Sequence, residues 1–463
     1  MSSVVLLGMM FALLGHTSFW VGLVNRMHGR AWPESLLRGL SLGCVLLWGL
    51  LGAGLVWQAL LAIPSPWVGD SVLRGWFSQL AWPWQTYLVG CWLIAGRNLW
   101  AWLWRQLLHR APKVLLSQAE EVFSLPVAAQ NGIRHHPLVW LPQNEILSLQ
   151  LTRREIQLAQ LPSQLDGLTL LHLSDLHFTG RVAQQWFRQA MEFCAQLEAD
   201  LVMFTGDFLD SMDCLDWIPN VFQPFQGRRG VYFILGNHDW RLDWQRIRAA
   251  IVQLGFESLG GRWTFVSTWA HAGKADKSVS CGNLTEAQSN RHEAIDPSGK
   301  TVKPVSFNEL LLSEDLDWPS IPPAFPRQPS SYEQNQQTRI LLAGNELPWI
   351  GPAPDMSEAP PPACDGGPIR ILLAHTPDQL RWARKHQFDL MLAGHTHGGQ
   401  IRLPLIGPIL TPSRTGVRYS GGVFHEPPTV LHVSRGISAE WPLRWNCPPE
   451  VVLLVLRSPS CSV

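Results

Sequence analysis

The chain has 463 residues, and its 36 Lys and Arg are balanced by 36 Asp and Glu. This composition, with 46% hydrophobic residues, excludes collagen-like, coiled-coil and wholly disordered proteins. The charge is unevenly placed, because residues 1–112 hold seven Arg, no Lys, one Glu and one Asp, together with 12 of the 24 Trp. Such a segment is typical of a membrane region, whereas residues 113–463 are net acidic and show no basic stripe, so no nucleic-acid partner is expected.

Uncharged runs in the first quarter predict membrane spans. Residues 4–24 and 39–63 each reach the length of about 20 residues that crosses a bilayer. A third span is predicted over residues 76–96, followed by an interfacial helix after Arg97, because apolar residues recur there with helical spacing. These residues are Trp100, Leu103, Trp104, Leu107 and Leu108. A single third span over residues 80–104, with Arg97 inside it, is the alternative.

The basic residues between the spans predict their orientation. Arg26, Arg30 and Arg38 lie between the first two spans, whereas only Arg74 lies between the second and the third. The positive-inside rule then places the N-terminus outside and the chain after residue 97 in the cytoplasm. The eight scattered Cys, with no CxxC pair, agree with a reducing compartment. His16, alone in an apolar run, is expected to pack or to hydrogen-bond between helices and has no assigned role.

The soluble part is predicted to be an α/β domain over residues 145–458, joined to the spans by a connector at 113–144. Residues 268–337 are expected to form a surface insertion, and residues 352–368 a Pro-rich loop. Short apolar runs predict buried strands, and amphipathic stretches between them predict covering helices. The strands are expected at 168–173, 201–204, 231–235, 369–373 and 390–392, and the helices include 182–197 and 241–254.

Five polar motifs follow these strands. Each motif taken singly is typical of an ordinary turn or helix cap. Together they bring three carboxylates, five His and one Asn to the edge of a sheet, which two divalent cations would explain. The motifs are Ser174-Asp175-Leu176-His177, Gly206-Asp207, Gly236-Asn237-His238-Asp239, Ala374-His375 and Gly394-His395-Thr396-His397-Gly398-Gly399.

As a set, the series DxH, GD, GNHD, H and GHxH resembles the calcineurin-like metallophosphoesterase superfamily over residues 166–457. SDLHFTG, GHTHGGQIRLP and PLRWNCPPEVVLLVL resemble the membrane-associated bacterial branch that includes the phosphodiesterases YaeI and YkuE. That branch is similar to the chlamydial-type UDP-2,3-diacylglucosamine pyrophosphatase. The resemblance implies a four-layer α/β/β/α sandwich, here preceded by a transmembrane helical region, and a multi-pass protein of the cell (inner) membrane.

The resemblance also implies residue roles. Two divalent ions, such as Mn, Fe or Zn, are expected, and a hydroxide activated by them attacks phosphorus. His238 is expected to act on the transferring phosphoryl group, with Asp239 orienting it, although His238 as a cap or supporting residue is the plainer alternative. The implied ligands are Asp175, His177 and His397 for one ion and Asn237, His375 and His395 for the other, with Asp207 bridging both.

The expected function is a membrane-anchored two-metal phosphoesterase that hydrolyses a phosphodiester or pyrophosphate bond. Anchoring favours an amphiphilic or lipid-linked substrate, because the enzyme is confined to the surface where that substrate lies. A UDP-2,3-diacylglucosamine pyrophosphatase of lipid A synthesis is the narrower alternative. A non-catalytic docking or sensor module on the same fold is the second alternative, which the complete ligand set opposes.

Overall fold

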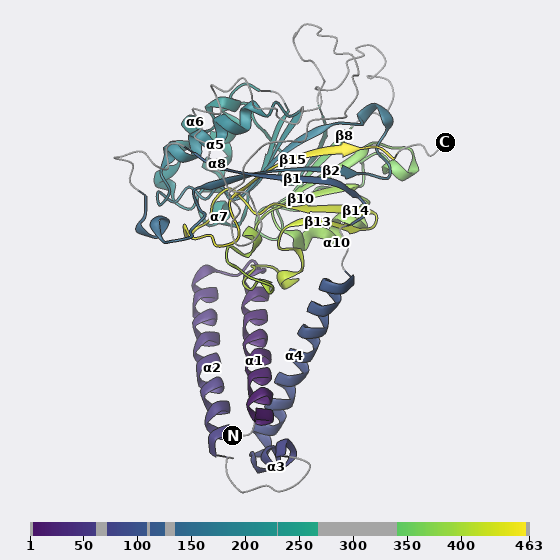
Figure 1. The fold of residues 1–463 in the computed structure, drawn as a ribbon. Coiled ribbons are helices and arrows are strands. Elements are labelled where there is room, and N and C mark those ends of the chain that lie inside the picture. The colour runs from purple at the N-terminus through teal and green to yellow at the C-terminus, as the bar shows by residue number, and fades with distance from the viewer. Residues whose placement is uncertain are drawn as a thin grey trace, which may run out of the picture.

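The computed structural model describes residues 3–61, 72–108, 112–125, 135–228, 230–266 and 340–459. The expected insertion at 268–337 lies outside these residues. A stalk of helices carries a two-sheet domain at one end, and the N-terminus lies at the opposite end (Figure 1). The helices of the stalk are α1 (Ser3–His28), α2 (Glu34–Leu61), α3 (Val72–Gln79) and α4 (Trp82–Leu108).

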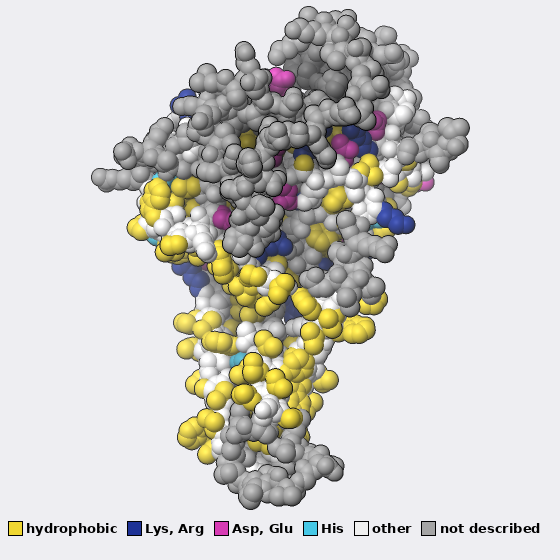
Figure 2. Space-filling model, viewed as in Figure 1, with side chains coloured by type: hydrophobic (Ala, Val, Ile, Leu, Met, Phe, Trp, Pro, Cys, Tyr) yellow, Lys and Arg dark blue, Asp and Glu magenta, His cyan; other side chains and the backbone are white. Residues whose placement is uncertain are grey.

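The stalk has an apolar surface. Hydrophobic side chains cover it, and charged side chains gather above it (Figure 2). Among the described helices, α1 and α2 are long and apolar enough to cross a membrane. Helix α4 packs closely on α1, because Gly15 faces the backbone of Cys91 and Ala95 without a Cβ between them. Residues 97–108 continue α4 as one helix, so the structure has no separate interfacial helix there.

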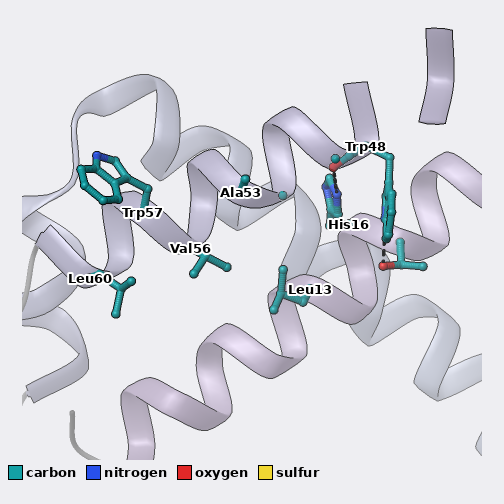
Figure 3. Close-up of a pocket in the computed structure, with 10 residues that line it drawn as sticks. Leu13, His16, Trp48, Ala53, Val56, Trp57 and Leu60 are labelled. Carbon is teal, nitrogen blue, oxygen red and sulfur yellow. Dashed lines mark hydrogen bonds between the residues drawn. The ribbon is translucent and has the colours of Figure 1, made fainter. Parts of the chain in front are cut away.

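His16 lies inside this bundle, as expected. Its Nδ1 lies 2.6 Å from the Tyr87 hydroxyl oxygen, and its Nε2 lies 3.0 Å from the Trp48 carbonyl oxygen. Beside it, an apolar hollow lies between α1 and α2, lined by residues such as Leu13, Val56 and Leu60 (Figure 3). Both ring nitrogens of His16 therefore contact neighbouring helices, Nδ1 on α4 and Nε2 on α2, which confirms the expected packing role.

The domain contains two mixed sheets. In the first, the order is β1-β2-β15-β3-β4-β5-β6, and β3 to β6 run parallel. In the second, the order is β13-β14-β10-β9-β8-β7, and β14, β10, β9 and β8 run parallel. The first comprises β1 (Leu115–Ser124), β2 (Ser148–Gln157), β15 (Glu450–Arg457), β3 (Thr169–Leu173), β4 (Leu201–Thr205), β5 (Val231–Ile234) and β6 (Glu257–Ser258). The second comprises β13 (Gly422–Glu426), β14 (Thr429–Val433), β10 (Leu390–Ala393), β9 (Ile369–Ala374), β8 (Ile340–Asn345) and β7 (Trp263–Phe265).

Three apolar layers hold the sheets and helices together. One lies between the sheets, where Leu170 and Met203 share a buried cluster with Ile371 and Leu392. A second covers the outer face of the first sheet, and a third covers the outer face of the second. The covering helices are α5 (Gln184–Gln196), α6 (Trp217–Val221) and α8 (Trp244–Val252) on the first sheet and α10 (Leu380–Lys385) on the second. This is the expected α/β/β/α sandwich.

Two segments differ from the sequence-based expectation or refine it. The predicted connector at 113–144 contributes β1, which pairs antiparallel with β2 at the edge of the first sheet. Its outward side chains are mostly polar, so hydrophobic alternation does not reveal it. The Pro-rich loop at 352–368 packs on the second sheet, where Trp263 Nε1 donates to the Asp355 carbonyl at 2.8 Å.

Candidate metal centre

The polar motifs meet where parallel strands of both sheets end. Asp175 follows β3 and Asp207 follows β4, while Asn237 opens the short helix α7 (Asn237–Arg241) after β5. From the second sheet, His375 follows β9, and His395 follows β10 two residues before His397. The carboxyl ends of parallel strands meet at one edge of each sheet, so these residues converge although up to 222 positions separate them.

One group consists of Asp175, His177 and His397, whose possible ligand atoms lie within 4.8 Å of one another. The Nε2 atoms of the two His are 3.1 Å apart. The Asp175 Oδ1 atom lies 3.8 Å from His177 Nε2 and 3.7 Å from His397 Nε2. Two imidazoles and a carboxylate that face one point are a donor set for a divalent transition metal.

A second group consists of Asp207, His375 and His395, again within 4.8 Å. Asn237 belongs beside them, because its Oδ1 lies 3.0 Å from His375 Nε2. Asp207 Oδ2 lies 3.0 Å from His375 Nε2 and 3.6 Å from His177 Nε2 in the first group. The Asp207 carboxylate therefore stands between the two groups, as a bridging ligand would.

One buried nitrogen fits a cation directly. Among the described residues that are expected ligands, His395 Nε2 is buried and has no hydrogen-bond partner. A buried polar atom without a partner costs about 1–3 kcal/mol, and a bound cation would remove that cost.

The backbone at these ligands is also unusual. Five of the seven expected ligands have positive φ, with values from 49° to 69°. Non-glycine residues adopt this conformation rarely, at roughly 1–3 kcal/mol each, and they cluster at functional sites. These residues are Asp175, His177, Asp207, His395 and His397.

Charge inside the site shifts the pKa values of its members. Burial alone raises the pKa of Asp207, but positive charge on His375 and His238 overcomes this and lowers it well below its usual value. Burial alone lowers the pKa of His375, but the Asp207 carboxylate overcomes this and raises it to about 9.

Hydrogen bonds behind the ligands fix which nitrogen faces the site. His375 Nδ1 donates to the Thr205 carbonyl at 2.6 Å, which leaves Nε2 free to bind. His397 Nδ1 lies 3.2 Å from the Ser438 carbonyl, and the buried Arg444 donates to the same carbonyl. Arg444 therefore holds the loop beneath His397.

Asp210 is a residue that the sequence analysis missed. It lies three positions after Asp207, and nothing in its local sequence distinguishes it from a polar turn residue. Its carboxylate oxygens both lie 3.0 Å from His177 Nδ1, and Oδ1 also lies 2.6 Å from His238 Nδ1. One carboxylate thus orients both a ligand and the expected catalytic histidine.

This contact corrects the expected partner of His238. The Asp239 carboxylate instead accepts the backbone N–H groups of Asp207, Phe208, Leu209 and Gly236 at 2.9–3.1 Å. These four bonds saturate its oxygens and tie the turn after β4 to the turn after β5. Asp239 shapes the loop that presents Asp207, and Asp210 orients His238.

Fold and site together define a metal-dependent phosphohydrolase of the two-sheet type. The family model for calcineurin-like phosphoesterases matches residues 168–399, half of the chain, so the chain belongs to this family.

Three relatives are similar to this chain at modest identity. Phosphodiesterase YaeI of Escherichia coli is 35% identical over 146 residues, 32% of this chain, and the match spans about half (51%) of YaeI. The uncharacterized metallophosphoesterase YkuE of Bacillus subtilis is 24% identical over 315 residues, 67% of this chain and 86% of YkuE. UDP-2,3-diacylglucosamine pyrophosphatase LpxG of Chlamydia muridarum is 23% identical over 333 residues, 68% of this chain and 92% of LpxG.

Proposed function

We propose that the protein is a membrane-anchored, two-metal phosphoesterase that hydrolyses a phosphodiester or pyrophosphate bond of an amphiphilic substrate. The observation that carries this proposal is the convergence of two donor groups on the Asp207 carboxylate. Asp175, His177 and His397 would hold one divalent ion, and Asn237, His375 and His395 would hold the other, with Asp207 bridging both. When bound, such ions polarise the phosphoryl group and lower the pKa of a water molecule.

The protein's own side chains have distinct tasks in this reaction. His238 engages Asp210 through Nδ1, so its Nε2 is available to the cleft that its side chain lines. There it stabilises charge on the phosphoryl oxygens or donates a proton to the leaving oxygen. Asp210 holds the ring in the orientation and tautomer that this transfer needs, and Asp239 holds the Asp207 turn in place.

We propose that the stalk spans the membrane and that the catalytic domain faces the cytoplasm. The end of α1 and the start of α2 lie beside the catalytic domain, where Asn25 Nδ2 donates to the Ile409 carbonyl at 3.0 Å. Arg26, Arg30 and Arg38 are therefore at the catalytic end of the stalk, which the positive-inside rule assigns to the cytoplasm. A C-terminal fusion to green fluorescent protein is expected to be fluorescent, and a C-terminal fusion to alkaline phosphatase is expected to be inactive. A dark first fusion with an active second fusion would contradict this orientation.

Metal-dependent turnover tests the enzymatic proposal. The detergent-solubilised protein is stripped of metal, supplied separately with Mn²⁺, Zn²⁺ or Mg²⁺, and assayed with bis-p-nitrophenyl phosphate. Turnover is expected with at least one metal and is expected to be lost in Asp207→Asn and His238→Ala. Proteins that bind metal but hydrolyse nothing would overturn the proposal.

A second candidate function is hydrolysis of UDP-2,3-diacylglucosamine. It rests on the relationship to LpxG, which extends over 92% of that protein. The same preparations are given UDP-2,3-diacylglucosamine, and release of UMP is measured. Fast UMP release with poor turnover of the generic diester would favour this candidate over a general phosphodiesterase.

A further inference from the structure

A cleft joins the metal centre to the end of the helical stalk. Its volume is about 880 Å³, and its walls run from Asn237, His238 and His395 to Asn25 and Leu37 on α1 and α2. Asn25 fastens the two walls together, because its side chain donates to the Ile409 carbonyl at 3.0 Å and accepts the Thr411 N–H at 3.1 Å. The Asn25 side chain is buried, so these bonds make the cleft a built feature of the fold.

The part of the cleft near the metal centre carries positive charge. Arg181 and Arg241 line it from the catalytic domain, whereas Arg38 lines the stalk wall of the cleft, where it pairs with Glu34. The Arg241 guanidinium makes no ion pair or hydrogen bond with any residue in the described ranges. Arg241 lies three residues after His238 in α7, on the same side of the helix. A guanidinium in this position suits a phosphate or diphosphate that extends from the metal centre.

The cleft also has apolar lining where the stalk meets the catalytic domain. Val24 and Leu37 line it from the helices, beside the polar Asn25, His28, Glu34 and Arg38, and Ile409 and Leu410 line it from the catalytic domain. Leu410 is 57% exposed. On α2, Leu40 follows Leu37 by one helical turn and is exposed on the outer surface of the stalk. The cleft therefore joins the metal centre to apolar side chains at the expected bilayer surface.

We infer that this cleft binds a phosphate ester carrying a long alkyl or acyl chain, which enters from the bilayer. The phosphoryl group lies against His238 and Arg241, and the chain passes between Leu37 and Leu410 towards the lipid. The cleft offers a guanidinium near His238 and apolar side chains at the stalk, which are the two features that such a molecule requires. The inference deepens the proposed function and rests on it for the reaction, but not for binding.

Two substrates with the same leaving group test the chain-binding part. Ethyl p-nitrophenyl phosphate and hexadecyl p-nitrophenyl phosphate, the latter in mixed micelles, both release p-nitrophenolate. We expect Leu410→Glu to lower the hexadecyl-to-ethyl ratio of kcat/KM by about tenfold, because a carboxylate beside the chain must be desolvated. The matched control Val252→Glu, at an exposed apolar position on α8, is expected to leave the ratio unchanged.

A second pair of variants tests the contact between Arg241 and the phosphoryl group. Arg241→Gln is expected to lower kcat/KM for both substrates roughly tenfold, since it removes a charge-assisted contact with the phosphoryl group. Arg246→Gln removes an exposed arginine of α8 and serves as the control. An unchanged ratio in Leu410→Glu, or equal behaviour of the two arginine variants, would overturn the inference.

Photocrosslinking gives a readout that does not depend on turnover. Hexadecyl phosphate with a diazirine at the end of its chain is expected to label peptides containing Val24, Leu37 or Leu410, and excess unlabelled hexadecyl phosphate is expected to compete. Labelling spread over the outer faces of α1 and α2 without competition would refute the cleft. If the cleft is labelled and the label is competed away, but the ethyl ester is not hydrolysed with any metal, only the proposed function is refuted. If the ethyl ester is hydrolysed but the cleft is not labelled, only the inference is refuted.

Discussion

Replacing Asp210 by Asn tests the link between the metal centre and the expected catalytic histidine. Its carboxylate contacts His177 Nδ1 at 3.0 Å and His238 Nδ1 at 2.6 Å. Burial alone raises the pKa of Asp210, but positive charge on both histidines overcomes this and lowers it, so the group is ionised at neutral pH. An amide has nearly the same shape but carries no charge, so an oxygen at the Oδ1 position accepts from both rings only as a neutral acceptor.

The structure sets the size of the expected effect. A hydrogen bond to a charged group contributes about 1.5–3 kcal/mol, against about 0.5–1.5 kcal/mol for a neutral pair, so weakening both contacts should lower kcat/KM roughly 10- to 100-fold. Because His177 is an expected metal ligand and His238 is not, the effect on His177 and the effect on His238 can be distinguished by varying the metal concentration. Excess metal should restore the part that depends on His177, and a reduced kcat at saturating metal should remain for His238.

The assay is hydrolysis of bis-p-nitrophenyl phosphate as a function of metal concentration, together with metal content of the purified protein. Asp213→Asn provides a matched control, because Asp213 is an exposed carboxylate three residues away. If Asp210→Asn and Asp213→Asn both stay within about twofold of the unaltered protein, the assigned role of Asp210 is wrong.

Three further predictions concern the hydrogen bonds of Asp239, the space around Gly394 and the pKa of His172. Asp239→Ala is expected to lower the free energy of unfolding by about 2–5 kcal/mol, measured by chemical denaturation, because four buried N–H groups lose their acceptor. Gly394→Ala is expected to reduce bound metal, measured by elemental analysis, because its Cβ would collide with the Ser174 hydroxyl and the Asp175 carboxylate. Burial lowers the pKa of His172 in the folded protein from 6.5 to about 4. Between these two pH values, the unfolded chain therefore binds a proton at His172 that the folded protein does not bind. Stability should therefore fall as the pH falls from 6.5 to about 4, and a denaturation series should show a shallower fall in His172→Gln.

Local sequence predicted much of the catalytic domain. The five expected strands appear as β3, β4, β5, β9 and β10, because each is an apolar run buried on both faces of its sheet. The ligand types also follow from sequence, since Asp, His and Asn directly after such strands must lie at the sheet edge. Strand β1 escaped prediction, because an edge strand can be held by backbone pairing with β2 while its side chains remain polar.

The tertiary structure alone decided which groups act on one another. Asp210 lies beside His177 and His238, and Asp239 lies beneath Asp207, because the turns after β4 and β5 pack together. Hydrophobic periodicity specifies strands and helices, but not how a turn is rotated towards its neighbour. The cleft depends on an even longer contact, since Asn25 and Ile409 are 384 positions apart in the chain. The sequence by itself determined which residue types are available as metal ligands, because they follow the buried strands. The packing of distant segments decided which side chains lie beside them and how the site opens towards the stalk.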